Sequence, residues 1–256
     1  MRNSNLRLDI TKVNSMTKSK IAIITGASIG IGREIVVALS QKGVFCIMVG
    51  RNKNGLQETL RIIEKKKGKG KIFSVDLSKQ SEIKSFVSKI KKDYKNVDIL
   101  VNAAGVWHND KEAYYGVTFE DHDIQRIQEI FDVGITGTTI LTQQLIPLIN
   151  SGGKIINITG DSSEEEKGWL PYLASKKYLD EFTKLLSVEL RNKLIQVNAV
   201  SPWYVWTAGV QTFFPDSKDE CLQPKYVADL VEFLASSRSD HITGQIFKIK
   251  QKTIKN

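Results

Sequence analysis

Short apolar runs alternate with amphipathic stretches along most of this chain, from residue 21 to residue 249. Continuous apolar runs are typical of strands buried on both faces, whereas apolar positions three or four residues apart are typical of helices. Strands are expected at 21–24, 44–49, 72–75, 97–101, 154–158, 195–200 and 245–249. Helices are expected at 30–42, 56–66, 82–94, 121–148, 172–191 and 225–235. The alternation predicts an α/β fold, a doubly wound parallel sheet of about seven strands with helices on both faces.

No linker rich in Pro, Gly or Ser interrupts this series, and no internal repeat appears. We therefore expect one domain over 20–250, with a flexible N-terminal extension at 1–19 and a short tail at 251–256. The extension is polar and basic, and Met16 stands just before the first expected strand. Residues 1–15 are thus either a disordered tail or an upstream reading of the start codon.

The net charge of +9 raises the question of nucleic-acid binding. Most of the excess lies in two lysine-rich stretches, 65–71 and 89–95, at the C-terminal ends of expected helices, where cations suit the helix dipole. Neither stretch alternates with the aromatic residues on which bases would stack. The pattern favours a solvated basic surface, and nucleic-acid binding is kept as the weakest hypothesis.

Several other classes of protein are disfavoured by the composition. No apolar run approaches the ~20 residues that cross a bilayer, so a soluble, cytoplasmic protein without a membrane partner is expected. The only two cysteines, Cys46 and Cys221, come with no sign of secretion, which argues against a disulfide. The three histidines are scattered and no Cys/His spacing fits zinc, so no metal site is expected.

A glycine-rich loop joins the first expected strand to the first helix, reading Thr25-Gly-Ala-Ser-Ile-Gly-Ile-Gly32. Glycines allow a tight turn and bring backbone N–H groups close to a pyrophosphate at the positive end of the helix. The position of the loop between strand and helix predicts a Rossmann-type dinucleotide site. Its expected contacts are Gly26, Ser28, Ile29, Gly30 and Ile31.

The second expected strand ends in Gly50, Arg51 and Asn52. Sites for NAD usually hold an acidic residue near this position, which accepts a hydrogen bond from the ribose 2′-hydroxyl. A guanidinium can instead bind a 2′-phosphate through charge-assisted hydrogen bonds. The sequence therefore favours NADP(H) over NAD(H), with Arg51 and Asn52 at the phosphate.

Five motifs in order resemble those of the short-chain dehydrogenase/reductase family. They are the glycine loop, Asp76-Leu77, Asn102-Ala103-Ala104-Gly105, Tyr172-x-x-x-Lys176 and the segment 197–202, which ends at Pro202. The resemblance implies that Asp76 and Leu77 contact the adenine and that Asn102, Ala103, Ala104 and Gly105 support the sheet and line the cofactor. It also implies that Pro202, Val205 and Thr207 lie near the nicotinamide.

The catalytic pair also makes chemical sense unaided. Tyr172 and Lys176 are four residues apart and share one helix face. An ammonium beside a phenol favours the phenolate, so the tyrosine pKa should fall from ~10 towards working pH. Such a group suits proton transfer to a carbonyl oxygen that receives a hydride. The resemblance adds that Lys176 bonds the nicotinamide ribose and that the reaction is hydride transfer between NADP(H) and a carbonyl or alcohol.

The serine that family members place after the fifth strand is not at its usual place. Aligned from the strand, this position falls on Gly160; counted back from Tyr172, it falls on Thr159. Ser162 follows in the same loop. A hydroxyl for the substrate carbonyl is therefore expected from Thr159 or Ser162.

Three further departures from the family pattern lie near the expected substrate. Gly134 stands where an asparagine that organises a proton-relay water is usual. Trp203 replaces the glycine that usually follows Pro202, and Lys248-Ile-Lys250 replaces a Gly-Gly ending of the last strand. The departures leave two hypotheses: an active reductase with an altered relay, or an NADP(H)-binding regulatory or scaffold protein with little turnover. Retention of Tyr172 and Lys176 favours the enzyme.

Aromatic residues are dense where the family has its mobile substrate loop, from Trp203 to Phe214, and again around Trp107 and His108. They form either an apolar lid over a moderately hydrophobic ketone or aldehyde, or packing against the core or a partner subunit. The resemblance also implies a homodimer or homotetramer built through the central helix and the helix at 172–191.

Overall fold

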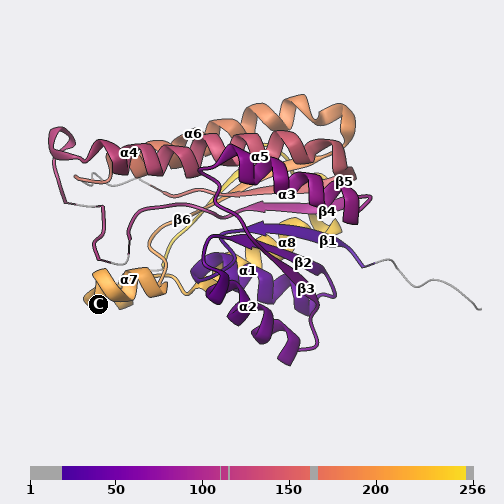
Figure 1. The fold of residues 1–256 in the computed structure, drawn as a ribbon, viewed down its shortest axis with the longest axis horizontal. Helices are drawn as coiled ribbons and strands as arrows, with labels where there is room; N and C mark the ends of the chain where they lie inside the picture. The colour runs from indigo at the N-terminus through magenta and orange to yellow at the C-terminus, as the bar shows by residue number, and fades with distance from the viewer. Residues whose placement is uncertain (1–18, 110, 115, 162–166, 252–256) are drawn as a thin grey trace, which may run out of the picture.

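The computed structural model describes residues 19–109, 111–114, 116–161 and 167–251. Seven parallel strands form one sheet in the order β3-β2-β1-β4-β5-β6-β7 (Figure 1). The strands are β1 Ile21–Thr25, β2 Phe45–Gly50, β3 Gly70–Ser74, β4 Val97–Asn102, β5 Ile149–Ile158, β6 Gln196–Pro202 and β7 Ile246–Ile249. The predicted doubly wound α/β fold is confirmed. The expected extension and tail lie almost wholly outside the described residues.

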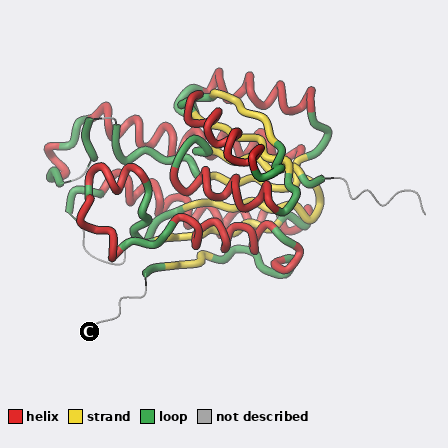
Figure 2. The backbone as a smooth tube through the Cα atoms, turned by 90° about the horizontal axis from the view of Figure 1, so that it is seen from below, coloured by secondary structure: helices red, strands yellow, loops and turns green. Residues whose placement is uncertain are grey.

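Helices cover both faces of this sheet, as Figures 1 and 2 show. The helices α1 Gly30–Gln41, α2 Lys53–Lys65 and α8 Pro224–Ala235 pack on one face, which is the side nearer the viewer in Figure 2. The helices α3 Gln80–Asp93, α4 Ile124–Phe131, α5 Thr138–Leu145 and α6 Leu170–Glu189 pack on the other. Over the described ranges, no helix combines the length and apolar character needed to cross a bilayer.

The continuous apolar runs are explained by two separate cores. Successive side chains of a strand point to opposite faces, so Ile23 and Ile24 of β1 enter different clusters, and both are fully buried. Ile24 packs with residues of α1, α2 and α8, and Ile23 packs with residues of α3 to α6. The sheet has no solvated face at its centre, which is why these strands do not alternate apolar and polar residues.

The long helix expected at 121–148 is divided in the structure. α4 passes into a π-helical turn at Asp132–Gly137, and α5 continues from Thr138. Gly137 approaches the carbonyl oxygen of Leu77 so closely that a Cβ atom would lie 2.1 Å from it. Because a side chain cannot enter this contact, the π-helical turn meets the segment between β3 and α3 at a glycine.

Two other elements differ from the expectation. β5 begins at Ile149, five residues earlier than its apolar run, and its register with β4 shifts between Val97 and Ile99. A short helix, α7 Ala208–Phe213, follows β6 where only a loop was expected. α7 lies below α4 at the left of Figure 1, beyond the carboxyl ends of the strands.

Candidate active site

A cavity of about 640 Å³ opens at the carboxyl ends of the strands, where the sheet order turns from β1 to β4. Ligands of open α/β sheets bind at such a switch point. The predicted site residues that line the cavity are Gly26, Ser28, Ile29, Gly30, Ile31, Arg51, Asn52, Leu77, Ala103, Ala104, Gly105, Thr159, Tyr172, Lys176, Pro202, Trp203, Val205 and Thr207. Ser162 lies outside the described residues.

The glycine loop is pressed against the segment that follows β4. Gly26 has a φ of +65°, and a Cβ atom there would lie 2.8 Å from the carbonyl oxygen of Ala103. The Thr25 hydroxyl accepts hydrogen bonds from the backbone N–H groups of Ala103 (3.0 Å) and Ala104 (3.1 Å). The two backbone walls of the cavity are thus fixed together at its floor.

The first turn of α1 opens into this cavity. Its N-cap residue, Ile29, provides no side-chain hydrogen bond, so the first N–H groups of the helix are not capped by it. Uncapped N–H groups at a positive helix end suit a phosphate. Together with the bare glycines, this donor set fits the pyrophosphate of a dinucleotide.

Two predicted cofactor residues do not form the cavity wall. The Asn102 side chain is buried beneath it and donates to Thr142 (3.0 Å) and Asn157 (2.9 Å), so it joins β4 to β5 and α5. The Asp76 carboxylate accepts from the N–H (3.0 Å) and hydroxyl (2.8 Å) of Ser78. This local turn directs it towards the start of α3. Asn102 thus supports the sheet, and neither Asn102 nor Asp76 is among the residues that line the cavity.

Tyr172 and Lys176 lie on one face of α6, and both line the cavity. The Lys176 ammonium donates to the carbonyl oxygen of Ile158 (3.1 Å) and lies 5.4 Å from the centre of the Tyr172 ring. The ammonium is therefore fixed between the end of β5 and the phenol ring.

The expected lowering of the tyrosine pKa is wrong for this structure. Burial raises the pKa of Tyr172 to about 12. Burial lowers the pKa of Lys176 to about 8, and the carboxylate of Asp180 opposes this shift. Desolvation disfavours the charged form of each group. The phenol is therefore protonated at neutral pH.

The structure shows where the hydroxyl at the serine position goes. Thr159 is buried, and its hydroxyl donates a long hydrogen bond (3.5 Å) to the carbonyl oxygen of Val200 on β6. Gly160 lines the cavity without a side chain; a Cβ atom added there would lie 3.4 Å from Cγ of Lys176. Gly134, where the family has asparagine, lies in the π-helical turn next to Ser175. A Cβ atom added at Gly134 would lie 3.2 Å from the hydroxyl oxygen of Ser175.

Asp161 was not recognised from the sequence. It lines the cavity directly after Gly160, its side chain is only 6% exposed, and its carboxylate pairs with Lys248 (2.9 Å) on β7. Lys248 stands where the family's Gly-Gly ending is missing, so this departure from the family pattern contacts the residue directly after Gly160. The unusual end of the last strand was the available signal.

Aromatic side chains form one side of the cavity. Trp107 packs on Trp169 (5.7 Å between ring centres) and on Phe214 (6.3 Å), and Trp169 packs on Tyr172 (5.7 Å). Phe214 follows α7, so the segment after β6 supplies part of this wall. Trp169 was missed, because only the fold brings it to the two predicted loops.

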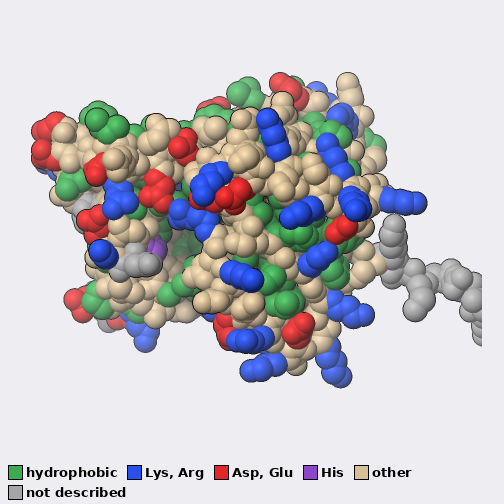
Figure 3. Space-filling model, viewed as in Figure 1, with side chains coloured by type: hydrophobic (Ala, Val, Ile, Leu, Met, Phe, Trp, Pro, Cys, Tyr) green, Lys and Arg blue, Asp and Glu red, His purple; other side chains and the backbone are tan. Residues whose placement is uncertain are grey.

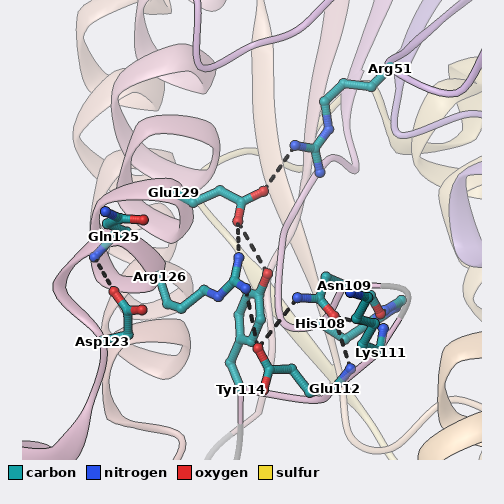
Figure 4. Close-up of polar contacts among 10 residues, drawn as sticks. All are labelled: Arg51, His108, Asn109, Lys111, Glu112, Tyr114, Asp123, Gln125, Arg126 and Glu129. Carbon is teal, nitrogen blue, oxygen red and sulfur yellow. Dashed lines mark hydrogen bonds and ion pairs between the residues drawn. The ribbon is translucent and has the colours of Figure 1, made fainter.

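An ion-pair network borders the cavity near the end of β2 (Figure 4). The Arg51 guanidinium lies 2.9 Å from the Glu129 carboxylate on α4. The Tyr114 hydroxyl (3.2 Å) and Arg126 (3.7 Å) approach the other oxygen of Glu129.

Within the described part of the chain, no three His, Cys, Asp or Glu side chains gather as metal ligands.

The face of the molecule drawn in Figure 3 shows no continuous groove lined by Lys and Arg side chains. Lys and Arg side chains there are spread singly, and acidic side chains lie beside several of them. This distribution gives the nucleic-acid hypothesis no support from that face.

Comparison with known proteins gives a consistent result. The family model described as short chain dehydrogenase matches residues 20–218. The 3-oxoacyl-[acyl-carrier-protein] reductase FabG of Thermotoga maritima is 28% identical, over 91% of this chain and 96% of its own. The NADPH-dependent aldehyde reductase 1, chloroplastic, of Arabidopsis thaliana is also 28% identical, over 90% of this chain and 84% of its own.

Solved structures agree with these relatives. The 3-ketoacyl-(acyl-carrier-protein) reductase from Brucella melitensis complexed with NADH is 27% identical, with a TM-score of 0.81 over 91% of this chain and 97% of that one. An actinorhodin polyketide ketoreductase variant with NADPH is 26% identical, with a TM-score of 0.79 over 90% and 95%. With a family match over most of its length, the chain belongs to the short-chain dehydrogenase family, whose members are hydride-transferring oxidoreductases that use a nicotinamide nucleotide.

Proposed function

We propose that the protein is an NADP(H)-dependent carbonyl reductase, or the reverse alcohol dehydrogenase, with Tyr172 as the acid/base. One observation carries the proposal: a single cavity joins the uncapped helix end and bare glycines to Tyr172 and Lys176. Arg51 lines the same cavity and supports the choice of NADP(H).

The bound coenzyme supplies or accepts the hydride at the substrate carbon. Tyr172 gives its phenolic proton to the substrate oxygen during reduction and takes it back during oxidation. The raised pKa of Tyr172 keeps this proton on the phenol at neutral pH. Lys176, held by the Ile158 carbonyl, places a donor beside the phenol and is the residue expected to bond the nicotinamide ribose.

The substrate is proposed to be a moderately hydrophobic ketone or aldehyde. Trp107, Trp169 and Phe214 give the cavity a large apolar wall next to Tyr172. The names of two relatives, an aldehyde reductase and an oxoacyl reductase, point to the same functional group.

The proposal is tested by following NADPH oxidation across a panel of ketones and aldehydes. We expect turnover by the native chain and a loss of at least about 100-fold in kcat for Tyr172→Phe. Tyr178→Phe is the matched control, because this tyrosine of α6 hydrogen-bonds to Thr139 (2.7 Å) instead of lining the cavity. Equal turnover by Tyr172→Phe and the native chain would contradict the assigned role.

A second candidate, an NADP(H)-binding regulatory protein with little turnover, is favoured by the serine position. Gly160 has no hydroxyl and that of Thr159 faces β6, so neither is directed at a substrate carbonyl as the structure stands. If the native chain binds NADPH at micromolar concentration and turns over none of the panel, this candidate replaces the enzyme.

A further inference from the structure

The arginine expected to hold the 2′-phosphate already has an anionic partner. Arg51, just after β2, contacts Glu129 of α4 through Nη1 and Oε1 at 2.9 Å. Their side chains are 50% and 26% exposed, and both line the cavity. The pair therefore lies where a coenzyme would arrive, in reach of water and ligand.

Glu129 is held in this position by neighbours other than Arg51. Its second oxygen accepts from the Tyr114 hydroxyl (3.2 Å) and lies 3.7 Å from Arg126. Arg126 also contacts Glu112 (3.2 Å), and its guanidinium lies 4.9 Å from the centre of the Tyr114 ring. Figure 4 shows Glu129 between the two arginines, so its carboxylate stays at the cavity wall when Arg51 moves away.

The charges of this network cancel. Arg51 and Arg126 are balanced by Glu112 and Glu129, so an arriving phosphate meets a neutral cluster with a carboxylate beside the arginine. The phosphate and the carboxylate must then share or exchange one guanidinium, and they repel each other at short range. A coenzyme without the 2′-phosphate leaves the Arg51–Glu129 pair intact.

We propose that Glu129 is a specificity-determining residue that competes with the 2′-phosphate for Arg51. It narrows the preference for NADP(H) over NAD(H) that Arg51 alone would create. This inference rests on the proposed coenzyme site, and it concerns the choice between the coenzymes rather than the reaction.

The test is the dissociation constant of NADPH and of NADH, measured by fluorescence titration for the native chain, Glu129→Gln, Arg51→Ala and the double variant. Glu129→Gln should lower the Kd of NADPH about fivefold, the size of a strong exposed ion pair. The Kd of NADH should stay within about twofold, since the 2′-hydroxyl carries no charge that would compete for Arg51. In the Arg51→Ala background, Glu129→Gln should lose most of its effect on NADPH, which shows that the two residues act together.

Glu112→Gln is the matched control. It removes a carboxylate from the same network, but one that contacts Arg126 and not Arg51, so the ratio of the two Kd values should stay at the native level. An equal shift for both coenzymes, or weaker NADPH binding in Glu129→Gln, overturns the inference while leaving the proposed function intact. Binding of neither coenzyme to the native chain overturns the proposed function and this inference together.

Discussion

Lys176 is an ammonium that the fold buries at a cost. Burial lowers its pKa from 10.5 to about 8, so the folded chain releases this proton before the unfolded chain does. Below pH 8 the folded and the unfolded chain both hold the proton, and the buried ammonium destabilises the folded state by its full amount. Between pH 8 and 10.5 the unfolded chain binds more protons, so the contribution of Lys176 to stability rises with pH.

Replacing Lys176 by Met is therefore expected to raise the free energy of unfolding most at neutral pH. The gain over the native chain should shrink by up to about 1.4 kcal/mol per pH unit between pH 8 and 10. Urea unfolding from pH 7 to 9.5 measures this slope. The loss of the hydrogen bond to Ile158 changes the free energy of unfolding by an amount that does not depend on pH. Lys177→Met removes the adjacent, half-exposed ammonium and serves as the control; a pH-independent gain in Lys176→Met would refute the expectation.

At single residues, the sequence predicted what depends on near neighbours. The glycine loop and Tyr172-x-x-x-Lys176 are recognised from the spacing of residues close together in the sequence, and both line the cavity. The partners of Arg51 and Asp161 stand 78 and 87 positions away, and only the folded sheet brings them close. The tyrosine pKa was missed for a similar reason, because burial is a property of the whole site.

Among the elements, β4 and β5 are joined to two helices by buried amides. Asn157 of β5 accepts from Asn102 of β4 (2.9 Å) and donates to Thr183 of α6 (2.8 Å). Such buried donors and acceptors are costly to leave unpaired. The network fixes β4 and β5 against α5 and α6, and Asn157 directly precedes Ile158, whose carbonyl accepts from Lys176.

Asn157→Ala is expected to lower the free energy of unfolding by about 2 kcal/mol or more, because it leaves polar groups of Asn102 and Thr183 without this partner. Urea denaturation measures the loss. Asn150→Ala, at the other end of β5, removes one partly buried bond to Asp98 (2.7 Å) and should cost clearly less. A loss no larger than that of the control would show that the amide network does not hold these elements together.

Element types were predictable from periodicity, and all seven strands and the main helices appear near their expected positions. Two features escaped it. A π-helical turn keeps the apolar spacing of a helix, so nothing in 121–148 separated α4 from α5. α7 has only six residues, too few for a periodic pattern, so the sequence predicted a loop in its place.

At the scale of the whole molecule, α6 keeps apolar side chains in solvent. Leu185 and Val188 are 65% and 59% exposed. They lie three residues apart on one face of α6, a helix through which the family resemblance predicts self-association. An exposed apolar face on a long helix suits an isologous contact with a second copy.

We expect the chain to form a homodimer or homotetramer and Leu185→Glu to reduce its mass in solution, because a charge would be buried at the contact. Size-exclusion chromatography with light scattering measures the mass. Tyr226→Glu, a similarly exposed position on α8 (55%), should leave the mass unchanged. A native chain that is monomeric at all concentrations would exclude the contact.

The widened turn between α4 and α5 has a geometrical consequence for the coenzyme end of the cavity. Each helical residue advances the side-chain direction by about 100°. Loss of one residue from 132–137 would turn this stretch into an ordinary helix and swing everything before it by about that angle around the axis. Glu129 would leave Arg51, and a single deletion far from the nicotinamide would free the guanidinium for phosphate. Helix phase, as much as side-chain identity, thus decides which charge faces the coenzyme.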